Sequence, residues 1–157
     1  MNMNIFLPYE NDIIKSLQSL DDRRLVKQVM ECKILTDIAL GKKSGYANHP
    51  VSKHYKDYPS FLIDYGLASC KEYEHRYQKM HQYLPYFEEI HKLEESYPFI
   101  PFYVEGSKRS PNCIRTSDNV SQLFQQKLIH KWNEDTVKGR PPRWTNREVA
   151  DFYIERG

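Results

Sequence analysis

One predicted helix carries side chains that together could act on a nucleic acid. Four polar residues recur there at spacings of three and four, so they share one helix face: Arg24, Lys27, Gln28 and Glu31. Arg23 lies at the edge of this face. Basic side chains near a helix start clamp phosphates, and a carboxylate among them acts as a base or stabilises a developing cation. The alternative is a solvated face on which Lys27 and Glu31 pair.

A second group of polar residues lies in a turn. In Asn48-His49-Pro50 a histidine precedes a proline with a fixed backbone angle, and His54 follows a few residues later. Such histidines donate hydrogen bonds to phosphates or base edges. The alternative is a hydrogen bond that anchors the loop. The six histidines show neither HxxxH nor HExxH spacing, so the sequence predicts no metal site.

Two further segments interleave aromatic and basic side chains. The first lies near the end of a long predicted helix and comprises Tyr73, Arg76, Tyr77, Lys79 and His81. Its aromatic rings either stack on bases or belong to the core, and the core is the preferred interpretation. The second runs from Lys138 through Arg140 and Arg143 to Trp144 and contains two prolines. Trp144 either stacks on a base or packs on the body of the protein.

The distribution of charge favours a polyanionic partner. The 157 residues carry a net charge of only +2, but residues 23–56 hold eight basic and two acidic residues, a local charge of +6. Residues 106–147, which include Arg115, hold nine basic and three acidic residues and also reach +6. One positive face would bind nucleic acid. The alternative is that the basic residues scatter over the folded surface.

The elements that must position these residues are helical. Apolar spacing, prolines and capping residues predict helices at about 10–17, 21–40, 50–57, 59–81, 83–95 and 118–133. Residues 5–9 are expected to be extended, and a long ordered loop is expected over residues 97–117. The predicted fold is all-α: one compact domain over residues 1–157, with long central helices and a loop-rich C-terminal segment.

The helix at 21–40 is expected to be central to the core. Its predicted apolar arc is wide and comprises Leu25, Val26, Val29, Met30, Cys32, Ile34, Leu35 and Ile38. Cys32, Cys70 and Cys113 are far apart without a CxxC motif, so we expect three buried thiols and neither a disulfide framework nor a zinc site. The sequence has no long apolar run and its start lacks the features of a signal peptide, so the expected location is the cytoplasm.

Several of these motifs together resemble a known family. They are Phe6-Leu7-Pro8-Tyr9, the run from Leu20 to Leu25, Lys27-Gln28, Glu31, Asn48-His49-Pro50 and the tail Arg140-Pro141-Pro142-Arg143-Trp144. Their order resembles the pyrimidine-dimer DNA glycosylases of the phage endonuclease V type and their small phage and bacterial relatives. The resemblance covers about residues 3–82 and the tail.

The resemblance implies a monomeric, helical, cofactor-free enzyme that kinks DNA, flips a nucleotide and cleaves the N-glycosidic bond. It also implies an AP-lyase step, in which the α-amine exposed by removal of the initiator methionine attacks the sugar. An α-amine with a pKa of about 7.7–8.0 is partly neutral at physiological pH and forms an imine. Asn2 is too large for the usual trimming, so the amine expected here is that of Met1, or of Met3 if translation starts there.

The family's site residues transfer only in part. Arg23 and Lys27 fit the phosphate clamp, but Arg24 stands where the catalytic carboxylate is expected, and Glu31 is the proposed substitute. We therefore expect Glu31, Met1 and Arg24 to be catalytic. The residues expected to contact DNA are Arg23, Lys27, Gln28, Asn48, His49, His54, Arg115, Lys138, Arg140, Arg143 and Trp144. The alternatives are a nucleic-acid-binding module without catalysis and a protein-binding helical domain.

Overall fold

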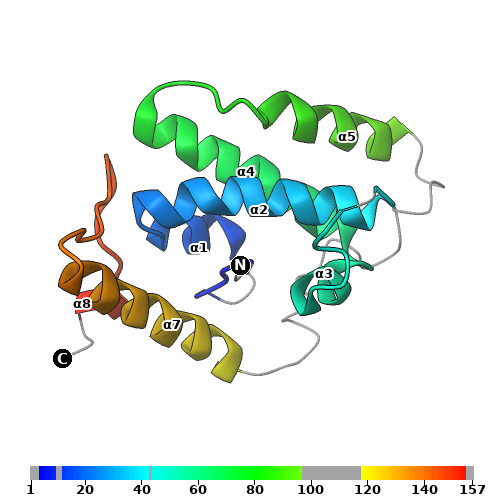
Figure 1. Cartoon of the computed structure of the whole chain (residues 1–157). Helices are drawn as coiled ribbons and strands as arrows, with labels where there is room; N and C mark the ends of the chain where they lie inside the picture. Colours follow the sequence, from blue (N-terminus) through cyan, green and yellow to red (C-terminus); the bar gives the residue numbers. More distant parts are fainter. Residues whose placement is uncertain (1–3, 10–11, 43, 97–117, 155–157) are drawn as a thin grey trace.

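A computed structural model describes residues 4–9, 12–42, 44–96 and 118–154. All regular secondary structure in these ranges is helical, which confirms the predicted all-α class (Figure 1). The helices are α1 (Ile13–Ser19), α2 (Asp22–Ala39), α3 (Pro50–Tyr55), α4 (Pro59–Tyr77), α5 (Leu84–Ser96), α7 (Asp118–Val137) and α8 (Asp151–Ile154). Within the described ranges, no helix is long and apolar enough to cross a membrane.

Capping residues define both ends of α2, which carries most of the predicted site. The Asp21 carboxylate accepts a hydrogen bond of 2.8 Å from the amide of Arg24 at the start. Gly41 follows the last turn with a φ of 91°, in the left-handed region that glycine adopts without strain. The next helix, α3, is capped by His49 and begins at Pro50, as predicted.

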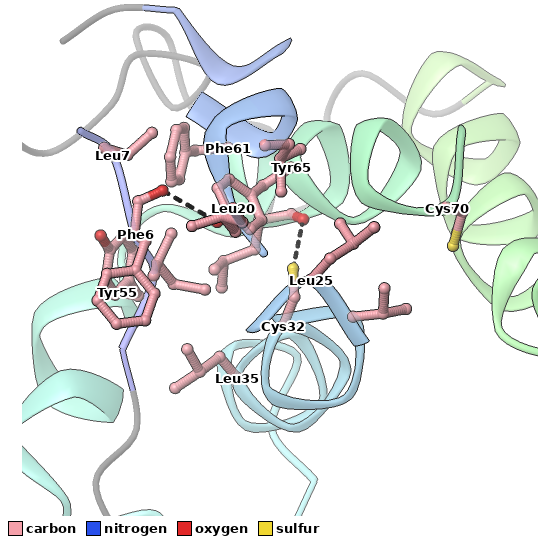
Figure 2. Close-up of a cluster of buried hydrophobic side chains, with 14 of the residues drawn as sticks. Phe6, Leu7, Leu20, Leu25, Cys32, Leu35, Tyr55, Phe61, Tyr65 and Cys70 are labelled. Carbon is pink, nitrogen blue, oxygen red and sulfur yellow. Dashed lines mark hydrogen bonds between the residues drawn. The ribbon is translucent and has the colours of Figure 1, made fainter. Parts of the chain in front are cut away.

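The core forms where α2 and α4 pack together around the N-terminal segment, residues 4–9. Ile5, Phe6 and Leu7 are almost completely buried. Figure 2 shows the Tyr65 hydroxyl of α4 against the Phe6 carbonyl oxygen, 3.0 Å away, and the Cys32 thiol donating to the Leu62 carbonyl. This segment has no regular secondary structure, so it is not a helix, as expected, and side chains of α2 and α4 satisfy its buried polar groups.

The buried face of α2 is narrower than predicted. Leu25, Val29, Cys32 and Leu35 are buried, but Val26 and Met30 are 42% and 37% exposed. The prediction was wrong for these two because α2 packs chiefly on α4 and α3, so the edge of the apolar arc stays in solvent.

The largest differences from the predicted helix boundaries have local causes or lie near the C-terminus. The first helix begins at Ile13 because the Asp12 carboxylate caps it, accepting from the amide of Lys15 at 2.9 Å. The long helix α4 ends at Tyr77 because Gln78 turns into the left-handed region, with a φ of 57°. The short helix α8 was not predicted, and α7 runs four residues beyond the predicted end. The expected loop at 97–117, with Cys113, lies outside the described residues, whereas Cys32 and Cys70 are buried free thiols.

The non-helical segment 138–150, hereafter the tail, docks on the start of α2. The amide of Asp22 donates to the Arg143 carbonyl at 2.8 Å. The Asp22 carboxylate accepts from the amide and hydroxyl of Thr145 at 2.9 and 2.5 Å. The indole N–H of Trp144 donates to the Ser19 carbonyl at 3.0 Å. These bonds bring the second basic segment of the sequence against the first.

Candidate nucleic-acid interface

A groove of about 690 Å³ opens between the first turns of α2 and the tail. Five basic residues that the sequence analysis assigned to DNA or catalysis line it: Arg23, Arg24, Lys27, Arg140 and Arg143. Helix α2 contributes the first three and the tail contributes the other two. Basic residues from both of the segments of charge +6 therefore line one surface, as a polyanion-binding face requires.

An acidic residue at the groove fixes one of these arginines. Asp135 of α7 is 6% exposed and forms an ion pair with Arg24, while Arg23 lies 3.8 Å from the same oxygen. Burial opposes ionisation of Asp135, but the hydrogen bond and charge of Arg24 outweigh it and lower the pKa of the carboxyl. The Arg24 side chain is only 12% exposed and that of Arg23 is 48% exposed. Arg23 is therefore the better placed of the two to reach a phosphate.

Glu31 lies two turns further along α2, where it is 3% exposed. Its Oε2 accepts a hydrogen bond of 3.0 Å from the backbone amide of Asn4. Burial raises the pKa of Glu31, while the Asn4 hydrogen bond and the charges of Lys27, Lys131 and His49 oppose that rise. The carboxylate is therefore shielded from water, next to the beginning of the chain and within the field of three basic groups.

Gln28 has a structural role within the protein. It is 1% exposed, and its side-chain amide is used within the protein. Its oxygen accepts from the amide of Phe6 at 2.9 Å and lies 2.7 Å from the Tyr65 hydroxyl, and its nitrogen donates to the Asn4 carbonyl at 2.8 Å. Gln28 therefore holds the N-terminal segment against α2, and its contact with DNA stays a prediction.

The Asn48-His49-Pro50 turn lies near Glu31, and His49 has a structural role as well. Its Nδ1 accepts a hydrogen bond of 3.1 Å from the amide of Val51, which is the loop-anchoring alternative. Asn48 is exposed and His54 is half-buried in α3. A hollow of about 320 Å³ lies beside the N-terminal segment and is lined by Asn4, Ile5, Pro50, Val51, His54, Tyr55 and Phe124.

The remaining predicted site residues have different surroundings. Trp144 packs against Trp132 and Tyr153, with ring centroids 5.2 and 5.1 Å away, so the structure gives this ring a packing role and its contact with DNA stays a prediction. Lys138 is exposed at the end of α7. Met1 and Arg115 lie outside the described residues.

In the aromatic and basic group at residues 73–81, Tyr73 packs against the core, as preferred for the rings, and Arg76 is buried as well. This arginine is 1% exposed and donates to Glu72 at 2.9 Å and to Asp22 at 3.0 Å. It also donates to the carbonyls of Leu17 and Gln18. Arg76 therefore joins α4, α1 and the start of α2 from within the protein.

Two residues of α7 lie close to the candidate site although their sequence did not indicate it. Asp135 forms an ion pair with Arg24, and the positive charge of Lys131 opposes the rise in the pKa of Glu31. The sequence does show that Lys131 and Asp135 are four residues apart, which places both on one face of the predicted helix. Nothing in the sequence indicated that this face meets α2. Among the residues that the structure describes, no three His, Cys, Asp or Glu side chains are grouped to hold a metal ion.

Comparison with known proteins found one family model that matches. It is described as pyrimidine dimer DNA glycosylase and matches residues 3–84, just over half of the chain. The matched range includes Arg23, Lys27, Glu31 and His49, whereas α7 and the tail lie beyond it. No curated protein and no solved structure matches the chain.

Proposed function

The chain belongs to the pyrimidine dimer DNA glycosylase family, and we propose that it releases a damaged or modified pyrimidine from DNA by cleaving the N-glycosidic bond. The observation that carries this proposal is the Glu31 carboxylate, which is buried against the N-terminal segment one helical turn beyond Lys27, a residue that lines the basic groove. Chemistry on a base requires an extruded nucleotide, a phosphate clamp and a group that stabilises the reacting sugar.

The phosphate clamp is assigned to the groove between α2 and the tail. Arg23 and Lys27 are exposed on α2, and Arg140 and Arg143 are exposed on the tail. Hydrogen bonds between Asp22 and the tail hold the two pairs in one groove, so they can contact successive phosphates of one strand. Arg24 is tied to Asp135, and we assign it to organising the groove.

Glu31 is assigned to the sugar. Cleavage of the N-glycosidic bond places positive charge on C1′ and the ring oxygen, and a nearby carboxylate stabilises that charge more strongly where water is excluded. Burial favours the neutral form of Glu31, while the Asn4 amide, Lys27 and Lys131 favour the ionised form. The site therefore holds an ionisable carboxylate that is poorly solvated, which is the state that gives the largest electrostatic effect.

The extruded nucleotide is assigned to the side of Glu31 that faces α3. The hollow lined by Asn4, His54 and Phe124 begins at the residue whose amide contacts Glu31. Its 320 Å³ accommodates a pyrimidine, and its aromatic and apolar walls suit a stacked base. His54 would supply a polar contact to the base edge.

AP-lyase activity is part of the proposal, with an α-amine as the nucleophile that the resemblance to the family implies. An amine that attacks C1′ forms an imine and allows elimination of the 3′ phosphate.

The proposal is tested by separating base release from strand cleavage. Purified protein is incubated with ultraviolet-irradiated and hypermodified duplexes, and free base and nicked strand are measured independently. We expect free base to be released from one of these substrates. A module that only binds nucleic acid would retain the duplex without releasing base, and that result on all substrates would contradict the proposal.

A further inference from the structure

A buried glutamate of α4 binds the tail through one arginine. Glu72 is 7% exposed. Arg147 of the tail donates to both of its oxygens, from Nε to Oε2 at 3.0 Å and from a terminal nitrogen to Oε1 at 2.7 Å. Two parallel hydrogen bonds of this kind fix both the distance and the orientation of a planar guanidinium group. In Figure 1 the tail, in orange, lies at the end of the molecule where α4 ends and α2 starts.

The same carboxylate also binds an arginine that has no access to water. The Arg76 side chain is 0% exposed, and its Nε donates to Glu72 Oε2 at 2.9 Å. A second carboxylate, that of Asp22, accepts from Arg76 at 3.0 Å. Glu72 is therefore shared between a buried arginine of α4 and a partly exposed arginine of the tail. Because Arg76 holds the carboxylate from inside the protein, α4 determines where Arg147 binds.

The residue between the two anchors of the tail, Thr145 and Arg147, is fixed as well. Asn146 has a φ of 53°, a left-handed conformation that asparagine tolerates better than most residues. Its side-chain amide donates to the Arg76 carbonyl at 2.8 Å, and its own carbonyl oxygen lies 3.1 Å from Nε2 of His75. Three consecutive residues of the tail are thus held by α4 and the start of α2, so the direction of the backbone at this point is set.

This anchored stretch lies next to the two cations that the tail contributes to the groove. Arg143 lies two residues before the first anchor, and Pro141 and Pro142 separate it from Arg140. The fixed φ angle of each proline leaves this connection few conformations. A displacement of residues 145–147 would therefore move the tail arginines from the positions that they occupy in the groove.

We propose that Glu72 is a positioning residue of the DNA interface, which acts through Arg147 to set where the tail presents Arg140 and Arg143 to the phosphates. This inference rests on the proposed function and extends it to the ion network behind the groove. Glu72 lies within the range matched by the family model, whereas the tail lies beyond it. A residue of the matched part of the chain thus docks a segment that the family model does not include.

The proposed role reverses the effect that charge alone would have. Because DNA is a polyanion, removal of an acidic side chain ordinarily strengthens DNA binding or leaves it unchanged. Glu72→Gln should weaken it instead, because a neutral amide cannot hold the two arginines that share this carboxylate. Glu74→Gln removes the same charge from an exposed position on the same helix and is the matched control.

The test measures the Kd for a duplex over a range of salt concentrations. Each phosphate contact contributes about 0.9 to the slope of log K against log salt, so loss of both tail arginines from the interface should reduce the slope by about 1.8. We expect this decrease for Glu72→Gln and the wild-type slope for Glu74→Gln. Arg147→Ala leaves the ion pair within α4 intact and should give the same decrease as Glu72→Gln, so it decides the matter if Glu72→Gln does not fold.

Double variants distinguish positioning from direct contact. If Arg147 acts by placing the tail, adding Arg143→Ala to Arg147→Ala should reduce the slope no further. Adding Arg23→Ala, which lies on α2, should still reduce it by about 0.9. Hydrogen exchange of the free protein provides a readout without DNA: the amides of residues 140–147 should exchange faster in Glu72→Gln and Arg147→Ala, while those of α7 keep the wild-type rate.

Unchanged or stronger binding by folded Glu72→Gln would overturn the inference, as would unchanged exchange in the tail. A further decrease in slope when Arg143→Ala is added to Arg147→Ala would also overturn it, since Arg147 would then contact a phosphate itself. Wild-type protein that neither binds DNA nor releases base would contradict the proposed function and this inference together. Base release by the wild type with a normal slope for Glu72→Gln and Arg147→Ala would remove only the role of Glu72.

Discussion

The backbone amide of Asn4 donates a 3.0 Å hydrogen bond to the Glu31 carboxylate. This bond joins the beginning of the described chain to a buried acidic group in the middle of α2. Gln28, one turn earlier on the same helix, accepts from the amide of Phe6. Together the two side chains satisfy extended backbone that is buried between helices, so one helix face both builds the fold and carries the proposed chemistry.

Base release should fall as the pH decreases through the raised pKa of Glu31. Only the ionised carboxylate stabilises a cationic sugar, and burial raises this pKa above the ordinary glutamate value of about 4.3. The single-turnover rate measured from about pH 8 down to about pH 4.5 tests this, with DNA binding followed at each pH. A rate that stays constant until the pH is below the ordinary value would contradict the assignment.

Glu31→Gln should not lower the stability of the fold at neutral pH. A carboxyl whose pKa is raised by folding contributes stability that is present below its unfolded pKa and is lost as the pH rises through its folded pKa. At neutral pH the ionised carboxylate of Glu31 therefore destabilises the folded protein, and Glu31→Gln removes that charge. The glutamine side chain keeps an oxygen that can accept the hydrogen bond from the Asn4 amide. We expect the Tm of the variant at pH 7 to equal or exceed that of the wild type. A large decrease would mean that the charge itself holds the N-terminal segment.

Asp22→Asn should destabilise the docking of the tail. Burial opposes ionisation of Asp22, but hydrogen bonds from Thr145 and Arg76 outweigh it and lower the pKa of this carboxyl. The ionised carboxylate therefore stabilises the fold above the pKa of the unfolded chain, and this stability is lost as the pH falls through the lower pKa of the folded protein. Removing the charge leaves the buried Arg76 with one carboxylate fewer, at a cost of about 3 kcal/mol. Chemical denaturation at pH 7 measures this. Exposed Asp57→Asn is the control and should change little.

The salt dependence of DNA binding should identify the phosphate clamp. Each phosphate contact contributes about 0.9 to the slope of log K against log salt, so Arg23→Ala and Arg143→Ala should each reduce the slope by about that amount. Lys92→Ala, on the exposed side of α5, should leave it unchanged. Equal slopes for all four proteins would show that DNA binds elsewhere.

Local signals predicted the helices well because each depends on a few neighbouring residues. The acidic pair Asp21 and Asp22 at the helix start, Gly41 after the last turn and Pro50 in a first turn all act within about four residues of the chain, although Asp21 proved to be the N-cap. The errors concern packing. Val26 and Met30 continue the apolar arc of α2, but none of the described helices covers them. Sequence periodicity does not say which face of a helix will have a packing partner.

The site was predictable only where one helix supplies the residues. The shared face of Arg24, Lys27 and Glu31 follows from spacing alone. The burial of Gln28, the pairing of Arg24 with Asp135 and the packing of Trp144 depend on contacts more than 20 residues apart in sequence. Gln28 was expected to be exposed because it shares a helix face with basic residues. The structure buries it instead, because the N-terminal segment needs its side-chain amide as a hydrogen-bond partner.

The central claim is that Glu31 is the catalytic carboxylate of a DNA glycosylase. The most direct test is the single-turnover rate of free-base release by wild type, Glu31→Gln and the control Glu89→Gln, which changes an exposed carboxylate on α5. We predict that Glu31→Gln binds the duplex with an unchanged Kd and releases base at least about 100-fold more slowly, while Glu89→Gln matches the wild type. Undiminished release by Glu31→Gln would contradict the claim.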